Sequence, residues 1–454
     1  MAMGRNRSST LAMGLSLCVA SSTAFAYGAA DPQVSPEAEA RIRALVEKIV
    51  QETLARQAQQ QTASTQAAAQ APVGDDTKAA IRGIVKEEVN QAKAEVASNK
   101  GSTSAEIIKE VTEKVKIYGV LDYGLTYVSN EGGSSKTGER DGVNWGNRLG
   151  FTGSQDLDWG LKAVFTIEHG FNLSDGSTSQ YGTTWGRQAY AGVENKWGRL
   201  TFGRQYDFVY DYMNQLNIGG YATTYAGHHG DFDRISGWRV DRAIKFQSAT
   251  FDGFKFGIMY ATDDAAYPGQ ASGNKETLSL GASYFAGPWS LSAAYVRIDN
   301  NDIYPDLQIG VSELLGQQLN FDGSALIVNQ ETAIVGGHYQ LGKLTLVGNT
   351  SQTTFKRDGD KATQHVYEIG GYYPIANKTT AIMGYQYSTL EHDNWDQVTF
   401  GLKRDLSDKT WLYASYSWMK ASDGVRANQG AGWYLDNSSD NRQDTARLGM
   451  VYTF

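Results

Sequence analysis

The sequence predicts an all-β protein, a transmembrane antiparallel β-barrel of about 16 strands preceded by a short α-helical coiled-coil extension. Many short segments alternate apolar and polar residues with a period of two, and the chain of 454 residues contains 50 glycines and 26 tyrosines. The connections between these segments alternate between short and long, as in barrels with tight turns on one side of a membrane. No apolar stretch after the N-terminal region is long enough to span a bilayer as a helix, which excludes a helical membrane protein.

Residues 1–26 have the three-part layout of a secretory signal peptide. Two arginines precede an apolar run over residues 11–20, and small residues follow as far as Ala26. We therefore expect cleavage after Ala26 and export from the cytoplasm. The single cysteine, Cys18, lies within this segment, so no disulfide is expected in the exported chain.

Residues 27–114 have a different composition, rich in Ala, Gln, Glu, Lys and Arg. Ile42, Val46 and Ile49 follow the spacing of a coiled-coil seam, and the pattern partly recurs after a linker over residues 57–76. Helices of two or three heptads are marginal alone in water, so we expect a periplasmic helical or coiled-coil extension that self-associates. A loosely helical periplasmic tail is the alternative.

Residues 115–454 are expected to form an outer-membrane barrel. Ile117 and Leu125 share one face of the first strand, and Leu448 and Met450 share one face of the last. A closed barrel satisfies every backbone hydrogen-bonding group, and about sixteen strands enclose a lumen wide enough to hold water. Long polar connections are expected at residues 129–144, 172–184, 207–237, 262–274, 299–328 and 421–444.

Charged residues within the strands mark the lumen face, because a charge on the lipid face near mid-membrane costs about 2 to 4 kcal/mol. Arg148 lies on the polar face of its strand, and Lys245 shares the parity of Arg239. These side chains are therefore expected to line the lumen. Arg242 has the opposite parity, so it lies either beyond the hydrocarbon band or at a β-bulge.

The barrel region resembles the Gram-negative general-diffusion porins, particularly those of β-proteobacterial type. The matching segments are Ile117-Tyr118-Gly119 and residues 147–153, 186–192, 202–207 and 449–454. The resemblance implies homotrimers of sixteen-stranded barrels, embedded in outer-membrane lipid, in which the loop after the fifth strand bends into the lumen. The last segment, with Tyr452 and Phe454, resembles the signal by which the outer-membrane barrel assembly machinery recognises its clients.

By this resemblance residues 207–237 form a constriction loop, and Arg148, Arg187 and Arg239 line the opposite wall. The loop lacks the Pro-Glu-Phe-Gly turn of enterobacterial members, and its acids lie towards its ends: Asp207, Asp211, Asp231 and Asp233. An arginine wall facing a tip with few carboxylates predicts a positive constriction and a mild anion preference. In the alternative, the last two of these acids pair with the arginines and leave the pore nearly neutral.

Other features bear on partners and chemistry. Asp175 and Arg204 resemble a family contact in which the second loop reaches a neighbouring subunit. His228 and His229 are adjacent and have no spaced third ligand, so we expect a polar loop pair and no metal site. The six histidines fall in no catalytic motif, so neither an enzyme nor a cofactor is expected. A net charge of −8 with interleaved signs argues against a nucleic-acid partner.

The expected function is that of an outer-membrane porin, a water-filled channel for passive diffusion of ions and small hydrophilic solutes. One alternative is a substrate-selective channel for small acidic solutes, which saturable block of conductance would reveal. The other is an envelope-tethering structural protein, in which the helical extension contacts the cell wall and the pore is secondary.

Overall fold

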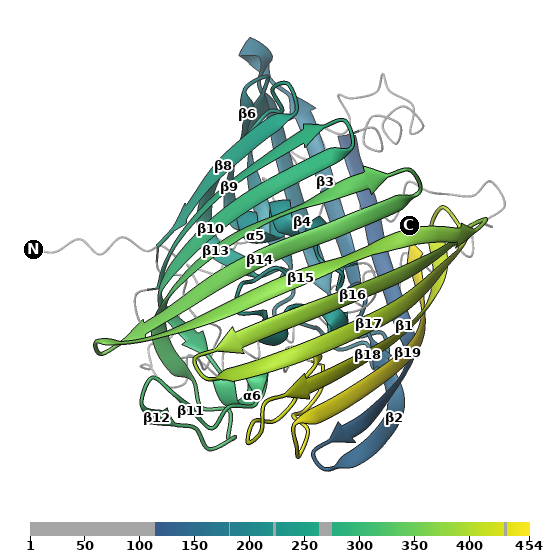
Figure 1. The fold of residues 1–454 in the computed structure, drawn as a ribbon. Coiled ribbons are helices and arrows are strands. Elements are labelled where there is room, and N and C mark those ends of the chain that lie inside the picture. The colour runs from purple at the N-terminus through teal and green to yellow at the C-terminus, as the bar shows by residue number, and fades with distance from the viewer. Residues whose placement is uncertain (1–113, 181, 221–223, 263–274, 431–433) are drawn as a thin grey trace, which may run out of the picture. The chain divides into compact units, whose positions relative to one another are not determined.

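The barrel in the computed structural model is closed by hydrogen bonding between its first and last strands (Figure 1). β1 (Val115–Glu131) pairs antiparallel with β19 (Arg442–Thr453), and the backbone of Phe454 exchanges two hydrogen bonds of 3.2 Å with Gly119. On its other side β1 pairs with two successive strands, β2 (Ser134–Asp141) and β3 (Arg148–Asp156). The sheet has 17 strands, of which β2 and β3 share one position, so the barrel has 16 strand positions, as predicted.

The other strands pair in chain order with their neighbours. They are β4 (Lys162–Gly170), β5 (Gln188–Asn195), β6 (Gly198–Tyr206), β7 (Arg239–Ser248), β8 (Phe254–Ala261), β9 (Glu276–Ala286), β10 (Trp289–Ile303), β13 (Leu326–Leu341), β14 (Leu344–Arg357), β15 (Asp360–Ala376), β16 (Thr379–Leu390), β17 (Asp393–Ser407) and β18 (Thr410–Ala421). Every pairing among them is antiparallel, which satisfies the backbone groups of each strand within the sheet.

The structure describes residues 114–180, 182–220, 224–262, 275–430 and 434–454, and Lys114 to Phe454 form one unit. The predicted signal peptide over residues 1–26 lies outside the described residues. So does the predicted extension over residues 27–114, apart from Lys114. Both remain predictions.

Two of the predicted long connections contain more structure than expected. Residues 129–144 include β2, which continues the pairing of β1 as a hairpin. Its residues are polar on both faces, so no alternation marked it as a strand. Residues 299–328 contain the helix α6 (Pro305–Ile309) and a small hairpin of β11 (Glu313–Leu314) and β12 (Gln317–Gln318).

Side chains alternate between the lipid and the lumen along the strands, as predicted. In β19 Leu448 is 61% exposed and Met450 47%, whereas Val451 is fully buried. The exposed positions form an apolar outer surface suited to lipid, and the lumen positions carry many buried polar side chains. Among the described residues, no helix is long and apolar enough to cross a bilayer.

The described residues of the predicted constriction loop, 207–220 and 224–237, fold into the barrel lumen after β6. They contain α5 (Phe208–Met213) and the short 3₁₀ turns Asn214–Leu216, Thr224–Ala226 and His229–Asp231. Figure 1 shows α5 on the inner side of the sheet, behind β10 and β13. Side chains of the loop belong to five buried clusters with the wall, whose loop members are Phe208 and Tyr212; Val209, Met213, Leu216 and Ile235; Ile218 and Ala226; Phe232; and Tyr225.

Two glycines allow α5 to lie close against the wall. A Cβ on Gly257 in β8 would lie 2.1 Å from the Phe208 ring, and one on Gly281 in β9 would lie 2.5 Å from the Tyr212 ring. Both distances are far below van der Waals contact, and the two rings are held in a buried cluster against the wall. A larger residue at either position therefore displaces the helix.

Gly281→Val is expected to loosen the constriction loop, because overpacking of this kind costs about 1 to 3 kcal/mol. The measurement is the rate of trypsin cleavage after Arg234, which is 6% exposed in the folded loop, using folded protein in detergent. We expect faster cleavage of Gly281→Val than of the unsubstituted protein. Gly348→Val is the matched control, because a Cβ there meets only a backbone oxygen at 3.6 Å. Equal cleavage rates for the two variants would contradict the role given to Gly281.

Candidate functional site

Three arginines meet at one side of the lumen, and we call Arg148, Arg187 and Arg239 the arginine cluster. Arg148 opens β3, Arg187 directly precedes β5 and Arg239 opens β7. All three line a cavity of about 490 Å³ between the constriction loop and the wall. The sequence predicted that these residues lie together, and the structure brings them to one cavity.

The arginine cluster is held by a hydroxyl and a carboxylate. Arg187 Nε lies 2.6 Å from Glu168 Oε1, and its Nη2 donates to Tyr206 Oη at 2.9 Å. Arg239 Nη2 donates to the same Tyr206 oxygen at 2.5 Å, and its guanidinium lies 4.5 Å from the centre of that ring. Tyr206 therefore orients two cations, a connection that sequence reasoning missed.

Arg148 and Arg239 carry charge that no carboxylate balances directly. Arg148 Nε donates to the carbonyl oxygen of Gly146 at 2.8 Å, a neutral partner. Within the described part of the chain, neither Arg148 nor Arg239 forms an ion pair. Because the charge of Arg187 is offset by Glu168, the net positive field of the cluster comes from the other two arginines.

Aromatic side chains line much of the same cavity. They are Trp145, Phe171, Tyr206, Tyr210, Trp238 and Tyr434. The rings of Tyr206 and Tyr210 stack with their centres 3.9 Å apart. The cavity thus combines cations with flat apolar surfaces.

The acids at the start of the loop are used for its internal architecture. Asp207 caps α5 by accepting from the Tyr210 backbone NH at 3.2 Å, and it pairs with Arg234 at 2.5 Å. Asp211 pairs with Lys245 of β7, also at 2.5 Å. Lys245 is turned into the lumen as predicted, but it is paired there and stands apart from the arginine cluster.

The acids at the end of the loop do not pair with the arginine cluster in the described residues. Asp231 accepts from Ser236 NH at 3.1 Å and from Trp238 Nε1 at 2.8 Å, and it lines the cavity. Burial, together with the nearby Asp233 carboxylate, raises the pKa of Asp231 to about 6. Asp233 is engaged elsewhere, by His228 and Ser351. The neutral-pore alternative, which required both acids to pair with these arginines, is therefore wrong in its geometry.

Arg242 does not line the cavity of the arginine cluster, and a place for it elsewhere in the pore lining stays a prediction. It is exposed and has a φ of +51°. β7 carries one residue more than β6 between the pairs Gly203–Ala243 and Gln205–Val240. This is the β-bulge that the parity of Arg242 left open, and it turns the residue away from the cavity.

The two residues expected at a subunit contact have partners within the chain. Arg204 pairs with Asp241 at 2.6 Å and donates to the carbonyl oxygen of Gly186 at 2.7 Å. The Asp175 carboxylate accepts from the Ser177 NH at 2.8 Å. Asp175 is therefore held within the second loop, and Arg204 of β6 is held to Asp241 of β7 and to Gly186.

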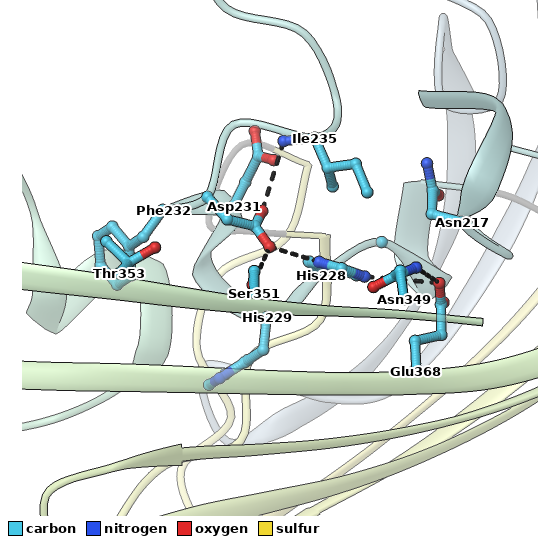
Figure 2. Close-up of polar contacts among 12 residues, drawn as sticks. Asn217, His228, His229, Asp231, Phe232, Ile235, Asn349, Ser351, Thr353 and Glu368 are labelled. Atoms are coloured by element: carbon cyan, nitrogen blue, oxygen red, sulfur yellow. Dashed lines mark hydrogen bonds and ion pairs between the residues drawn. The ribbon is translucent and has the colours of Figure 1, made fainter. Parts of the chain in front are cut away.

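Sequence reasoning also missed a buried ionic cluster at the loop tip (Figure 2). His228 Nδ1 lies 2.5 Å from Asp233 Oδ2, and its Nε2 lies 3.5 Å from Glu368 Oε2 of β15. Burial alone would lower the pKa of His228, but the two carboxylates raise the pKa to about 10. Burial alone would raise the pKa of Asp233, but His228 holds that pKa below its usual value. His228 is therefore an imidazolium at neutral pH, whereas burial lowers the pKa of His229 to about 3 and leaves it neutral.

A set of wall glutamines holds the backbone of the loop tip through neutral hydrogen bonds. Gln386 accepts from His229 NH at 2.9 Å, and Gln364 donates to His229 carbonyl oxygen at 3.0 Å. Gln397 and Gln330 donate to the carbonyl oxygens of Tyr225 and Phe232, at 2.5 and 2.6 Å. The four glutamines lie on β13, β15, β16 and β17, so the loop reaches across the lumen to the far wall.

A closed barrel whose lumen is narrowed by an inward loop and lined by fixed cations defines a channel-forming membrane protein of the porin class. Residues 92–424 match the Gram-negative porin family, and the chain belongs to that family. It is an outer-membrane porin and not an enzyme.

Known proteins of this kind are similar over most of the chain. An outer membrane porin protein of Bordetella pertussis is 28% identical over 344 residues, which cover 67% of this chain and 89% of the relative. An anion-selective porin from Comamonas acidovorans matches with a TM-score of 0.61 at 22% identity, over 75% of this chain and 99% of that one. An outer membrane protein of Vibrio cholerae in a trimer form matches with a TM-score of 0.54 at 17% identity, again over 75% and 99%. The two structural likenesses establish the fold alone.

Anion preference is expected to fall as the pH rises through about 6, the pKa of Asp231. Below that value the carboxyl is neutral, and above it a negative charge is added to the cavity that holds the arginine cluster. The measurement is the reversal potential in a salt gradient at pH 5 and pH 7.5. Asp231→Asn should give the same, more anion-favouring potential at both values. The same pH dependence in Asp231→Asn and in the unsubstituted protein would assign the titration to another group.

Proposed function

We propose that the pore admits ions and small hydrophilic solutes by passive diffusion with a mild preference for anions. The arginine cluster forms the positive wall of the constriction, and residues 207–237 form the opposite side. The observation that carries this proposal is that Arg148 and Arg239 line the cavity without a carboxylate partner in the described residues. In a narrow pore with low-dielectric walls, two uncompensated charges are enough to bias permeation.

Other charged side chains of the lumen are compensated by partners. Lys245 with Asp211, and Arg234 with Asp207, are neutral pairs that shape the lumen without adding net charge. Asp231 tempers the positive field when it is ionised, and Asp233 is compensated by His228. The preference is therefore mild.

A second candidate is a channel selective for small acidic solutes, favoured by the aromatic side chains around the arginine cluster. Arginine and aromatic surfaces together suit a carboxylate attached to a flat apolar group. Saturable block of the current by benzoate, but not by acetate, would support this function over general diffusion. A current that changes in proportion to the concentration of either anion, without saturation, would support general diffusion.

We further propose that the protein is a homotrimer, with Asp175 and Arg204 close to the contact between subunits. The apolar outer surface and the Vibrio cholerae relative in a trimer form support this proposal. The C-terminal Tyr452 and Phe454 project from the outer face, 40% exposed each, where the barrel assembly machinery could bind them. The N-terminal extension is proposed to lie in the periplasm, where contact with the cell wall would make it a tether.

Arg148→Gln and Arg239→Gln are each expected to lower the anion-to-cation permeability ratio by about twofold or more, because each removes a fixed charge from the constriction. The measurement is the reversal potential of each variant in a planar bilayer under a salt gradient. Arg242→Gln is the matched control, since its side chain lies at the bulge and outside the cavity. A ratio in Arg148→Gln and Arg239→Gln equal to that of Arg242→Gln would contradict the proposed role of the arginine cluster.

Deletion of residues 27–113 separates the porin from the tether. If diffusion is the main function, cells with the shortened chain keep their uptake of small solutes. If tethering is the main function, they instead release periplasmic proteins and become sensitive to detergent. Envelope leakage with unchanged single-channel conductance would show that the extension carries the main role.

A further inference from the structure

A charged contact joins the tip of the constriction loop to the far wall of the barrel. His228 and Asp233 belong to the loop, Glu368 belongs to β15, and the three side chains are 0%, 0% and 2% exposed. The imidazole lies between the two carboxylates, with Nδ1 towards Asp233 and Nε2 towards Glu368 (Figure 2). We call these three residues the loop latch.

Besides the imidazole, uncharged groups donate hydrogen bonds to the two carboxylates of the loop latch. Asp233 Oδ2 accepts from Ser351 Oγ at 2.5 Å. Glu368 accepts from Asn349 Nδ2 at 2.8 Å and from Ile218 NH at 3.2 Å, so it holds the loop at a second point. These donors satisfy lone pairs but bring no positive charge. Among the described residues, the imidazolium is the cation that pairs with these two buried carboxylates, which lie on either side of it.

The position of Glu368 in the sheet connects the loop latch to the rest of the far wall. Cross-strand register places Asn349, Glu368, Gln386 and Gln397 side by side on β14, β15, β16 and β17. The two glutamines of this row bind the loop backbone through neutral hydrogen bonds, which are individually modest. Glu368 adds a buried charge contact to this row: the imidazole Nε2 lies 3.5 Å from its carboxylate without a hydrogen bond, and separating the two charges leaves an uncompensated charge in the interior.

We propose that His228, as an imidazolium, is a positioning residue for permeation. It locks the loop tip to Glu368 on β15, fixes the cross-section of the pore, and shields permeating ions from the two carboxylates. Loss of either end of the contact frees the loop tip to fluctuate in the lumen, which is seen as channel closure. This proposal rests on the proposed diffusion function and adds the element that keeps the pore open.

The test compares two variants of the full chain in planar bilayers at pH 7, His228→Gln and Glu368→Gln. Both remove the ionic contact, so both should raise the frequency of spontaneous closures by about tenfold or more. Their effects on ion selectivity should be opposite. His228→Gln leaves two carboxylates uncompensated and moves the reversal potential towards cation preference, whereas Glu368→Gln leaves a net neutral pair and moves it towards anions.

Two further variants separate the charge from packing. His228→Lys keeps a cation and should restore the reversal potential, and at least part of the open time, lost in His228→Gln. His229→Gln changes the adjacent buried histidine, which packs against Trp395 with the ring centres 4.4 Å apart and is neutral. It should leave the reversal potential unchanged, because it alters no charge.

The outcomes are distinguishable. Closures at the unsubstituted frequency in both His228→Gln and Glu368→Gln, or selectivity shifts of the same sign, would overturn the loop latch. If His228→Gln does not fold, as judged by its electrophoretic mobility before and after heating, Glu368→Gln and His228→Lys decide the question. Absence of any conductance from the folded, unsubstituted protein would instead overturn the proposed diffusion function.

Discussion

Hydrocarbon offers no hydrogen bonds, and this constraint determines most of the structure. Every backbone N–H and C=O inside the bilayer must be paired within the protein, so the sheet closes through β1 and β19. Closure gives each strand one face towards lipid and one towards the lumen. The lipid face is apolar, and the lumen face carries the polar and charged side chains that lipid cannot accept.

The same polar lumen face is what holds the constriction loop. On the side of β8, β9 and β10 the loop packs through apolar side chains, helped by glycines that leave room for α5. At the far wall it is bound by glutamines and by the ionic contact of His228 with Glu368. The loop is thus attached on two sides. A cavity remains beside the arginine cluster, and the proposed function assigns its fixed charges to the permeation of ions.

The barrel could be predicted from the sequence because the alternation of apolar and polar residues is visible within each strand, without knowledge of distant contacts. The faces of β1 and β19 and the lumen orientation of Arg148 follow from alternation alone. Arg242 was ambiguous, since parity cannot tell a bulge from a position beyond the membrane, and only the backbone with its positive φ decides between them. β2 was missed because its residues are polar on both faces.

The constriction was less predictable because it depends on contacts between distant residues. Glu368 lies 140 positions after His228, and nothing in the sequence around it marks a residue that faces a loop from another part of the chain. The role of Tyr206 between Arg187 and Arg239 was missed for the same reason. The two adjacent histidines were expected to form a polar loop pair, and the structure gives them different environments: His228 pairs with Asp233, whereas His229 is buried as a neutral ring.

An inward loop and an arginine cluster are proposed to set a constricted, mildly anion-preferring pore. The most direct measurement is the single-channel current of the refolded, unsubstituted protein in a planar bilayer under a tenfold salt gradient. The account predicts ohmic steps and a reversal potential that favours anions. Ohmic steps with a reversal potential that favours cations would contradict it, because the field of Arg148 and Arg239 would then not govern permeation.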